Sequence, residues 1–323
     1  MNVLSLFDGM SCGRIALERA GIKVDNYFAS EINKKSMEIS KKNYPDIIQL
    51  GNVCNIKYKD GVLYSDNGSY SVKIDLIIGG SPCQTFSSLG NNSGFNGKSG
   101  LFYEYVRLKE ETDANNFLLE NVKMKTEWKE EITEQLGVSP IELNSKNVSA
   151  QNRPRLYWSN ISFATPHDLH ITLSDIIEKD VDEKYYLTDK AKVYITQKDR
   201  LKKQLVNLNG NSNHKAITLL ARYTGLNGTF LVVDCNGKLD NEKAGTLTAR
   251  YAKGVASFGG DSFVYDMEDI GLERIRRFTP TECERLQTVP EGYTEGVADT
   301  HRYEMLGNGW TVDIIAHIFK GLV

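Results

Sequence analysis

The sequence predicts an α/β protein in which helices cover both faces of a mostly parallel sheet, with a smaller, mostly β domain attached. Three observations support this fold class. Short apolar runs alternate with helical patterns over residues 1–165, which is typical of buried parallel strands and their crossover helices. After about Pro166 the pattern changes to short β-type runs rich in Asn and Gly, and helical spacing resumes from Asp269. We therefore expect one domain from residues 1–165 and 271–323, and a second from residues 166–270.

Strands and helices alternate along the first predicted domain. A strand over residues 2–7 ends in a glycine-containing turn, and a helix follows over residues 14–20. Further strands are predicted at 27–29, 48–50, 74–78 and 117–119, a polar helix near 33–43, and a capped helix start at 279–282. Ligands of such sheets bind beyond the carboxyl ends of the strands. The polar residues that follow those ends are therefore candidate site residues.

Composition excludes several classes of protein. The chain has 323 residues, 40% of them hydrophobic and 25% charged, as in ordinary globular proteins. No apolar run approaches the roughly 18 residues of a membrane span. The first ten residues contain Asp8 and do not resemble a secretory signal, so we expect a cytoplasmic protein. The 5 cysteines form no Cys-x-x-Cys pair and the 5 histidines no ligand pattern, so neither a disulfide framework nor a metal site is expected.

The loop after the first strand, residues 7–13, suggests a nucleoside-containing cofactor. Its two glycines allow a ligand to approach the backbone. Glu31 follows the loop at a sequence spacing suited to binding ribose hydroxyls. A purely structural turn is the alternative. The glycine spacing departs from Gly-x-Gly-x-x-Gly, which disfavours a nicotinamide oxidoreductase.

A thiol and an acid follow two neighbouring predicted strands. Cys83 comes after a buried strand, in a turn fixed by Pro82, as nucleophiles commonly do. Glu120 ends the next strand and is placed to donate a proton. The alternatives are a buried inert cysteine and a helix-capping acid.

Residues 151–158 carry two arginines on an extended segment. Strand alternation would point Gln151, Arg153 and Arg155 to one side. Two guanidinium groups aimed at one place suit an anion, or a carbonyl that gains charge during a reaction. A surface strand with ion pairs is the alternative.

The middle of the chain is basic although the formal net charge is −3. Residues 184–254 contain 13 Lys and Arg against 5 Asp and Glu, a balance of +8, which suits a phosphate backbone or simply a solvated face. Residues 215–223 recur 28 positions later, so that Arg222 and Arg250 occupy equivalent positions. We expect at least one of these two arginines to contact a nucleic acid, although an outward-facing arginine on a repeated hairpin fits as well.

Taken in order, these motifs resemble the DNA cytosine carbon-5 methyltransferases, which use S-adenosylmethionine. The resemblance covers residues 3–160 and 270–318 and leaves the middle unmatched. It rests on Pro-Cys-Gln at 82–84, Glu-Asn-Val at 120–122 and Gln-x-Arg-x-Arg at 151–155, with further blocks at 100–104, 277–287 and 307–312. The first and last blocks look most like the animal de novo group.

The resemblance implies a covalent mechanism and the S-adenosylmethionine-dependent methyltransferase variant of the Rossmann-like fold. Cys83 would add to carbon 6 of a cytosine flipped out of double-stranded DNA, while Glu120 holds the ring nitrogen and the amine and supplies a proton. Arg155 would bind the cytosine carbonyl oxygen and Arg153 would brace the site. Gln84 and Ser87 would lie on a loop that closes over DNA, and the middle segment would recognise the target.

The resemblance also implies a cofactor site for S-adenosylmethionine, with S-adenosylhomocysteine as product. Phe7 would stack on adenine and Glu31 would bind the ribose. The other residues of the implied pocket are Asp8, Gly9, Ile32, Asn52, Val53, Pro82, Leu101, Asn308 and Trp310. Asn52 replaces the family's usual Asp, and its amide oxygen can still accept a hydrogen bond. Arg277, Glu282 and Gln287 would form a structural block.

Two alternatives to a DNA methyltransferase remain. A transfer-RNA methyltransferase would keep the chemistry, but the characteristic insert of that branch is absent from the sequence. A non-enzymatic DNA-binding regulator would be expected to lack the thiol or the acid, and both are present. We expect a monomer whose partner is DNA, with any cognate restriction endonuclease acting separately.

Overall fold

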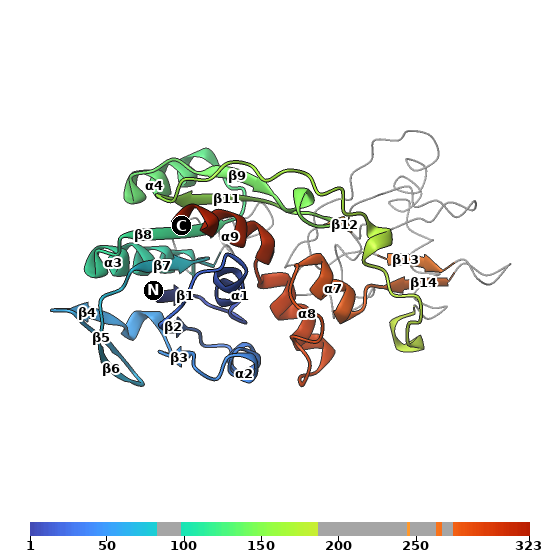
Figure 1. The fold of residues 1–323 in the computed structure, drawn as a ribbon, viewed down its shortest axis with the longest axis horizontal. Coiled ribbons are helices and arrows are strands. Elements are labelled where there is room, and N and C mark those ends of the chain that lie inside the picture. The colour runs from blue at the N-terminus through green and yellow to red at the C-terminus, as the bar shows by residue number, and fades with distance from the viewer. Residues whose placement is uncertain (83–97, 187–243, 246–262, 267–273) are drawn as a thin grey trace. The chain divides into compact units, whose positions relative to one another are not determined.

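The computed structural model describes residues 1–82, 98–186, 244–245, 263–266 and 274–323, and Figure 1 shows the chain as a ribbon. This described part divides into two compact units. Unit 1 comprises Met1–Asn144, Pro154–Pro166 and Trp310–Val323, and unit 2 comprises Ser145–Arg153 and His167–Gly309. Among the described residues, no helix is both long enough and apolar enough to cross a membrane.

Unit 1 is built on one large sheet. Seven strands of the described chain form it in the order β3-β2-β1-β7-β8-β11-β9. Their bounds are β1 Asn2–Leu6, β2 Asn26–Ser30, β3 Ile48–Gln49, β7 Leu76–Gly79, β8 Asn116–Asn121, β9 Ile141–Asn144 and β11 Pro154–Ser159. The strands from β3 to β8 pair in parallel, and β11 runs antiparallel to β8 and β9. Because the chain moves outward from β1 to β3 and then returns to β7 on the other side of β1, the topological switch point lies between β1 and β7.

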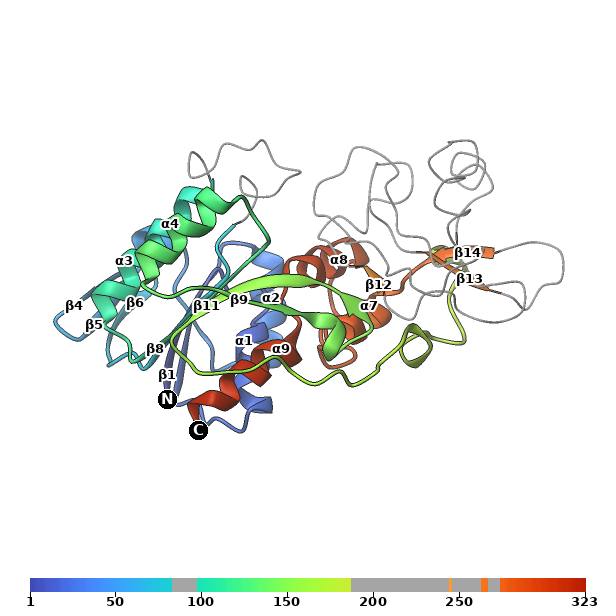
Figure 2. The same ribbon diagram turned by 90° about the horizontal axis from the view of Figure 1, so that it is seen from above.

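Helices cover both faces of this sheet. Figure 2 shows α3 (Phe102–Thr112) and α4 (Thr126–Leu136) over one face, and α1 (Cys12–Arg19) with α9 (Val312–Phe319) over the other. Helix α2 (Lys34–Asn43) follows β2 and begins at Asn33, whose side chain accepts from the N–H groups of Lys35 and Ser36. The α/β class and the mostly parallel sheet predicted from the sequence are confirmed.

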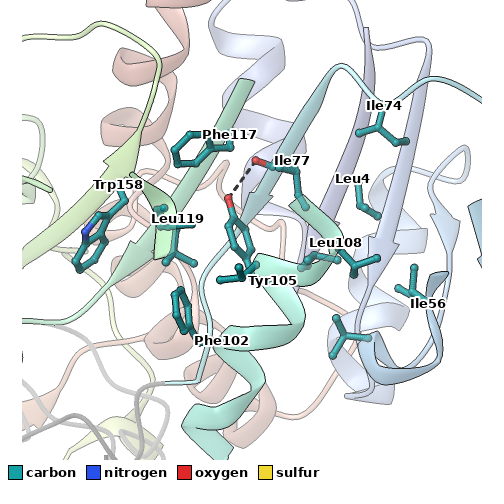
Figure 3. Packing of buried hydrophobic residues seen from close by; sticks show 14 of the residues in the cluster. Leu4, Ile56, Ile74, Ile77, Phe102, Tyr105, Leu108, Phe117, Leu119 and Trp158 are labelled. Carbon is teal, nitrogen blue, oxygen red and sulfur yellow. Dashed lines mark hydrogen bonds between the residues drawn. The ribbon is translucent and has the colours of Figure 1, made fainter. Parts of the chain in front are cut away.

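The core between the sheet and α3 is apolar and close-packed. Figure 3 shows Phe102, Tyr105 and Leu108 of α3 against side chains of the strands, and all three are fully buried. The Tyr105 hydroxyl donates to the Ile77 carbonyl at 3.4 Å, so the buried phenol keeps a hydrogen-bond partner. This packing fixes β7 and β8, the two strands that lead into the candidate active site.

Shorter elements complete unit 1. Strands β4 (Lys57–Lys59), β5 (Val62–Ser65) and β6 (Gly68–Ser71) form a separate antiparallel sheet. The 3-10 helices are η1 (Val53–Asn55), η2 (Lys98–Leu101) and η7 (Lys320–Leu322).

Unit 2 contains the described helices α7 (Pro280–Leu286) and α8 (Asp299–Asn308). Its described strands and 3-10 helices are β10 (Gln151–Asn152), β12 (Ala244–Gly245), β13 (Phe263–Asp266), β14 (Arg274–Arg277), η3 (Ser145–Asn147), η4 (Leu173–Asp175) and η5 (Glu183–Tyr185). Strand β10 pairs in parallel with β12, and β13 pairs antiparallel with β14.

The start of α7 is tied to its surroundings by buried polar bonds. Thr279 and Glu282 form a capping box with Pro280 in the first turn, as the sequence predicts. Arg276 donates to both oxygens of Glu282 at 2.8 Å, and the two side chains are 2% and 0% exposed. The Glu178 N–H also donates to Glu282, at 2.9 Å. These bonds join residues 274–309 to residues 167–186 within unit 2. The expected first domain of residues 1–165 and 271–323 stays a prediction. A target-recognition domain over 166–270 stays a prediction, because most of those residues lie outside the described part.

Candidate active site

The loop after β1 is held against the end of β2. The Asp8 N–H donates to the Ser30 carbonyl at 3.0 Å, and the Gly9 N–H donates to Glu31 Oε2 at 2.7 Å. Phe7, Gly9 and Ser11 all have left-handed φ values, of 58°, 60° and 64°. Such a backbone costs free energy at a non-glycine residue and persists only where its surroundings determine it. The conformation of this loop, at the switch point of the sheet, is therefore fixed by its surroundings.

Glu31 completes this loop. Its Oε1 accepts from the N–H groups of Ile32 and Asn33, both at 2.7 Å, while Oε2 accepts from the Gly9 N–H. A carboxylate oxygen can accept more than one hydrogen bond, so Oε2 can also accept from a ligand. Ile32 is 73% exposed, and a Cβ built on Gly9 would meet no atom within 4 Å. An oriented carboxylate beside an exposed apolar side chain and open space fits the ribose and base of a nucleoside.

Asp8 points to hydroxyl groups of its own unit. Its Oδ1 accepts from Ser5 Oγ at 2.6 Å and from the Tyr27 hydroxyl at 2.7 Å, and Ser11 Oγ donates to Oδ2. Burial raises the pKa of this carboxyl to about 6, against the opposing effect of the three hydroxyl donors. The Asp8 side chain thus shapes the loop, and its place among the cofactor-binding residues stays a prediction.

Asn52 and Val53 follow β3. Asn52 Oδ1 accepts from the Cys54 N–H at 3.1 Å and caps η1. An amide oxygen can accept two hydrogen bonds. Val53 is buried in the apolar core. The side chain of Asn52 is exposed, so its amide can reach a ligand at this edge of the sheet.

Glu120 lies near the end of β8 with both carboxylate oxygens engaged. Arg155 Nε is 2.9 Å from Oε1, and Trp310 Nε1 donates to Oε2 at 3.1 Å. The side chains of Arg155 and Glu120 are only 11% and 12% exposed, so the pair is largely shielded from water. The structure therefore holds one carboxylate by two donors from different segments of unit 1.

The segment that leads to Cys83 starts beside this carboxylate. Strands β7 and β8 are parallel neighbours with Gly79 opposite Leu119, and a Cβ on Gly80 would lie 3.1 Å from Glu120 Oε2. Asn121 Nδ2 donates to Ser81 Oγ at 3.1 Å. This bond between strand ends was not predicted, although the buried polar residue in Glu-Asn-Val was a signal for it. Pro82 is the last described residue before the gap. Cys83, Gln84, Ser87, Arg222 and Arg250 lie outside the described residues.

The two arginines expected to converge have different protein partners. Arg155 pairs with Glu120, whereas Arg153 Nη2 donates to the carbonyls of Gly307 and Gly309 at 3.1 and 3.0 Å. Arg153 falls between β10 and β11 rather than within a strand, so simple alternation does not extend through it. Gln151 Nε2 donates to the Leu286 carbonyl at 3.0 Å.

The remaining expected cofactor residues have ordinary surroundings. Leu101 ends η2 and packs against the apolar core, and Asn308 is the exposed last residue of α8. Within the described residues, no group of three or more His, Cys, Asp or Glu side chains is arranged to hold a metal ion.

Comparisons with known proteins give a consistent result. A family model described as C-5 cytosine-specific DNA methylase matches residues 1–323. The type II methyltransferase M1.ScrFI of Lactococcus lactis subsp. cremoris is 29% identical over 344 residues, which cover 99% of this chain and 77% of the relative. The orphan methyltransferase M.SPRI of Bacillus phage SPR is 24% identical, with 100% and 97% covered. The Entamoeba histolytica methyltransferase EhMeth has a similar fold, with a TM-score of 0.69, 18% identity, and 100% and 99% of the two chains covered.

Proposed function

The chain belongs to the C-5 cytosine-specific DNA methylases, and on this premise we propose which of its residues transfer a methyl group from S-adenosylmethionine to carbon 5 of cytosine in DNA. The proposal rests on one observation above all. The Glu120 carboxylate lies beside Gly80, at the start of the segment that leads to Cys83, and is oriented by Arg155 and Trp310.

Cys83 and Glu120 activate the base. Cys83 Sγ adds to carbon 6 of the flipped cytosine, and Glu120 supplies a proton to the ring nitrogen, so that the electron pair displaced by the thiolate makes carbon 5 nucleophilic. After methyl transfer, loss of the carbon-5 proton and of Cys83 restores the aromatic ring. A thiol cannot reach carbon 6 within a duplex, which is why the base must leave the stack.

The two arginines have separate tasks. Arg155 adjoins Glu120, and this neighbourhood supports its assignment to the cytosine carbonyl oxygen. Arg153 is buried and bonded to the carbonyls of Gly307 and Gly309, so it braces the segment that precedes Trp310 in the sequence.

The residues of the β1 and β2 strand ends fit S-adenosylmethionine. When bound, this cofactor supplies an electrophilic methyl group on a sulfonium. Glu31 binds the ribose hydroxyls through the acceptor capacity that its backbone donors leave free. The other residues assigned to the pocket are Phe7, Asp8, Gly9, Ile32, Asn52, Val53, Pro82, Leu101, Asn308 and Trp310.

The DNA contacts belong to residues beyond the described part. We assign Gln84 and Ser87 to a loop next to Cys83 that contacts DNA, and Arg222 and Arg250 to contacts of the basic middle segment. The similarity to bacterial type II and phage enzymes supports a bacterial cytoplasm or phage-infected host as the setting. The protein is assigned the state of a monomer. Any cognate restriction endonuclease would act as a separate protein.

Bisulfite sequencing of a plasmid carried in cells that express the protein tests this assignment. Wild type is expected to methylate cytosine within one short sequence motif, and Cys83→Ser and Glu120→Gln are expected to leave the plasmid unmethylated. Equal methylation by Cys83→Ser would refute the covalent role of Cys83. An unmethylated plasmid with the wild type would count against DNA as the substrate and direct the test to RNA.

A further inference from the structure

We propose that Trp310 is a positioning residue for Glu120, in addition to its assigned place in the cofactor pocket. This inference deepens the proposed function and rests on it. The observation behind it is the bond from Trp310 Nε1 to Glu120 Oε2, at 3.1 Å. It joins residues 190 positions apart in the sequence, both in unit 1.

The indole occupies a place that two glycines leave open. A Cβ on Gly13 would lie 3.5 Å from Trp310 Cζ3, and a Cβ on Gly80 would lie 3.0 Å from Trp310 Nε1. Gly13 belongs to α1 and Gly80 follows β7, so the ring is in contact range of a helix and a strand end at once. A larger side chain at position 80 would push the ring away from Glu120, whereas at position 13 an added Cβ would be in ordinary contact with the ring and would clash first with Ile78 and Tyr27.

The backbone of Trp310 is anchored by the helix that follows. Thr311 is the N-cap residue of α9, and α9 buries Val312, Ile314, Ile315 and Ile318. This helix packs against α1, which itself covers the sheet. A side chain attached immediately before so well-buried a helix has little freedom to shift, and an ordered donor is what positioning of a catalytic group requires.

The two donors act on different oxygens of the carboxylate. Arg155 fixes Oε1 and Trp310 fixes Oε2, so together they set the plane of the Glu120 carboxyl group. A Trp N–H can donate but not accept, so it does not compete with Glu120 for the proton that the reaction moves. Loss of this donor would leave the carboxyl group free to rotate, and the fraction in the productive orientation would fall.

Exchange of the cytosine 5-hydrogen with solvent, measured without cofactor, tests the inference apart from the cofactor pocket. In this reaction the Sγ–C6 bond forms, Glu120 protonates the ring nitrogen, carbon 5 takes a proton from water and loses its original hydrogen, and the Sγ–C6 bond then breaks. We expect Trp310→Phe to slow release of tritium from 5-tritiated cytosine about tenfold, as loss of a hydrogen bond to a charged group would do. DNA affinity should stay within about twofold, because the ring does not act through binding.

Two further variants separate the lost N–H from lost packing. 3-Benzothienylalanine at position 310 keeps the shape of the indole without its N–H and is expected to slow the exchange as much as Trp310→Phe. Trp128→Phe, on α4 next to Lys125, is the matched control and should exchange at the wild-type rate. With cofactor present, Trp310→Phe should lower kcat at least as strongly as it raises KM for S-adenosylmethionine.

The outcomes distinguish failure of the positioning role of Trp310 from failure of the proposed function. Wild-type exchange rates in both position-310 variants would overturn the positioning role while leaving the proposed function intact, as would a rise in cofactor KM with kcat unchanged. A wild-type protein that neither exchanges the 5-hydrogen nor methylates DNA would overturn the proposed function, and with it this inference.

Discussion

Single atoms decide whether the candidate site can form. Gly80 is the clearest example, because a Cβ there would lie 3.0 Å from Trp310 Nε1 and 3.1 Å from Glu120 Oε2. Both distances are tighter than almost all real Cβ contacts, so the bond between those two side chains depends on a missing methyl group.

Gly80→Ala is therefore expected to lower turnover. The added methyl should separate Trp310 from Glu120 and reduce kcat about tenfold, with a stability loss of roughly 1–3 kcal/mol from overpacking. Steady-state methylation and urea unfolding measure the two effects. Gly21→Ala is the control, since its Cβ meets nothing within 4 Å while its φ of +74° still strains alanine. Gly21→Ala should lose stability without losing turnover, and a Gly80→Ala enzyme with wild-type kcat would contradict the proposed packing.

Asp8 makes stability depend on pH. Burial raises the pKa of its carboxyl from 3.8 to about 6 in the folded chain. Between these values the folded state holds a proton that the unfolded state has released, so this contribution to stability is complete below pH 3.8 and is lost as the pH rises through about 6. Urea unfolding at pH 5 and pH 7.5 should show a smaller loss of stability on going to pH 7.5 in Asp8→Asn than in the wild type. An identical pH dependence in the two proteins would show that Asp8 does not titrate in this range.

At the scale of elements, the sequence anticipated the strands and helices that have strong apolar patterns. The predicted strands over 2–7, 27–29, 48–50, 74–78 and 117–119 correspond to β1, β2, β3, β7 and β8. Strands β4 to β6 were missed because they are short and mostly polar. Their turns contain Asp60-Gly61 and Asn67-Gly68, and such pairs are typical of hairpins, so a usable signal was present.

The start of helix α7 was predicted from its capping box, but the buried ion pair between Arg276 and Glu282 was not. Arg276 and Glu282 are 2% and 0% exposed and form two bonds of 2.8 Å. Glu282→Ala removes the carboxylate that pairs with the buried Arg276 cation, so we expect a loss of about 3–5 kcal/mol in the free energy of unfolding. Glu38→Ala, which breaks the exposed pair with Lys35, should cost less than about 1 kcal/mol. Similar losses in the two variants would mean that the buried pair contributes no more to the free energy of unfolding than the exposed pair does.

At the scale of the whole molecule, the order of motifs indicated the reaction, whereas the contacts between segments distant in the sequence are known only from the structure. The bond from Trp310 to Glu120 and the separate partners of Arg153 and Arg155 depend on how strand ends meet, which no local pattern encodes. The grouping of residues 271–309 with unit 2 depends likewise on long-range bonds, such as that from Gln151 to the Leu286 carbonyl.

The assignment of Glu31 to the ribose predicts a ligand-dependent stability. At a concentration 100 times its Kd, S-adenosylmethionine should stabilise the wild type by about 2.7 kcal/mol. Glu31→Ala should lose most of this stabilisation, because it removes the ribose acceptor and the support of the Gly9 N–H. Thermal unfolding with and without cofactor measures the effect, with Glu38→Ala on α2 as the control that keeps it. If S-adenosylmethionine stabilised Glu31→Ala as much as the wild type, Glu31 would not be a residue that binds the cofactor.

The proposal that Cys83 forms a covalent bond to cytosine has the most direct test. Fluorine at carbon 5 cannot leave as a proton does, so DNA with 5-fluorocytosine at the target position should trap the protein after methyl transfer. Mass spectrometry of the digested complex should place the modified base on Cys83 and find no complex with Cys83→Ser. Burial raises the pKa of the Cys283 thiol, so Cys283 is not expected to react in its place, and the exposed Cys54 tests whether solvent access alone is enough for reaction. A modified base on Cys54, or methylation of ordinary DNA without any trapped complex, would contradict the proposed mechanism.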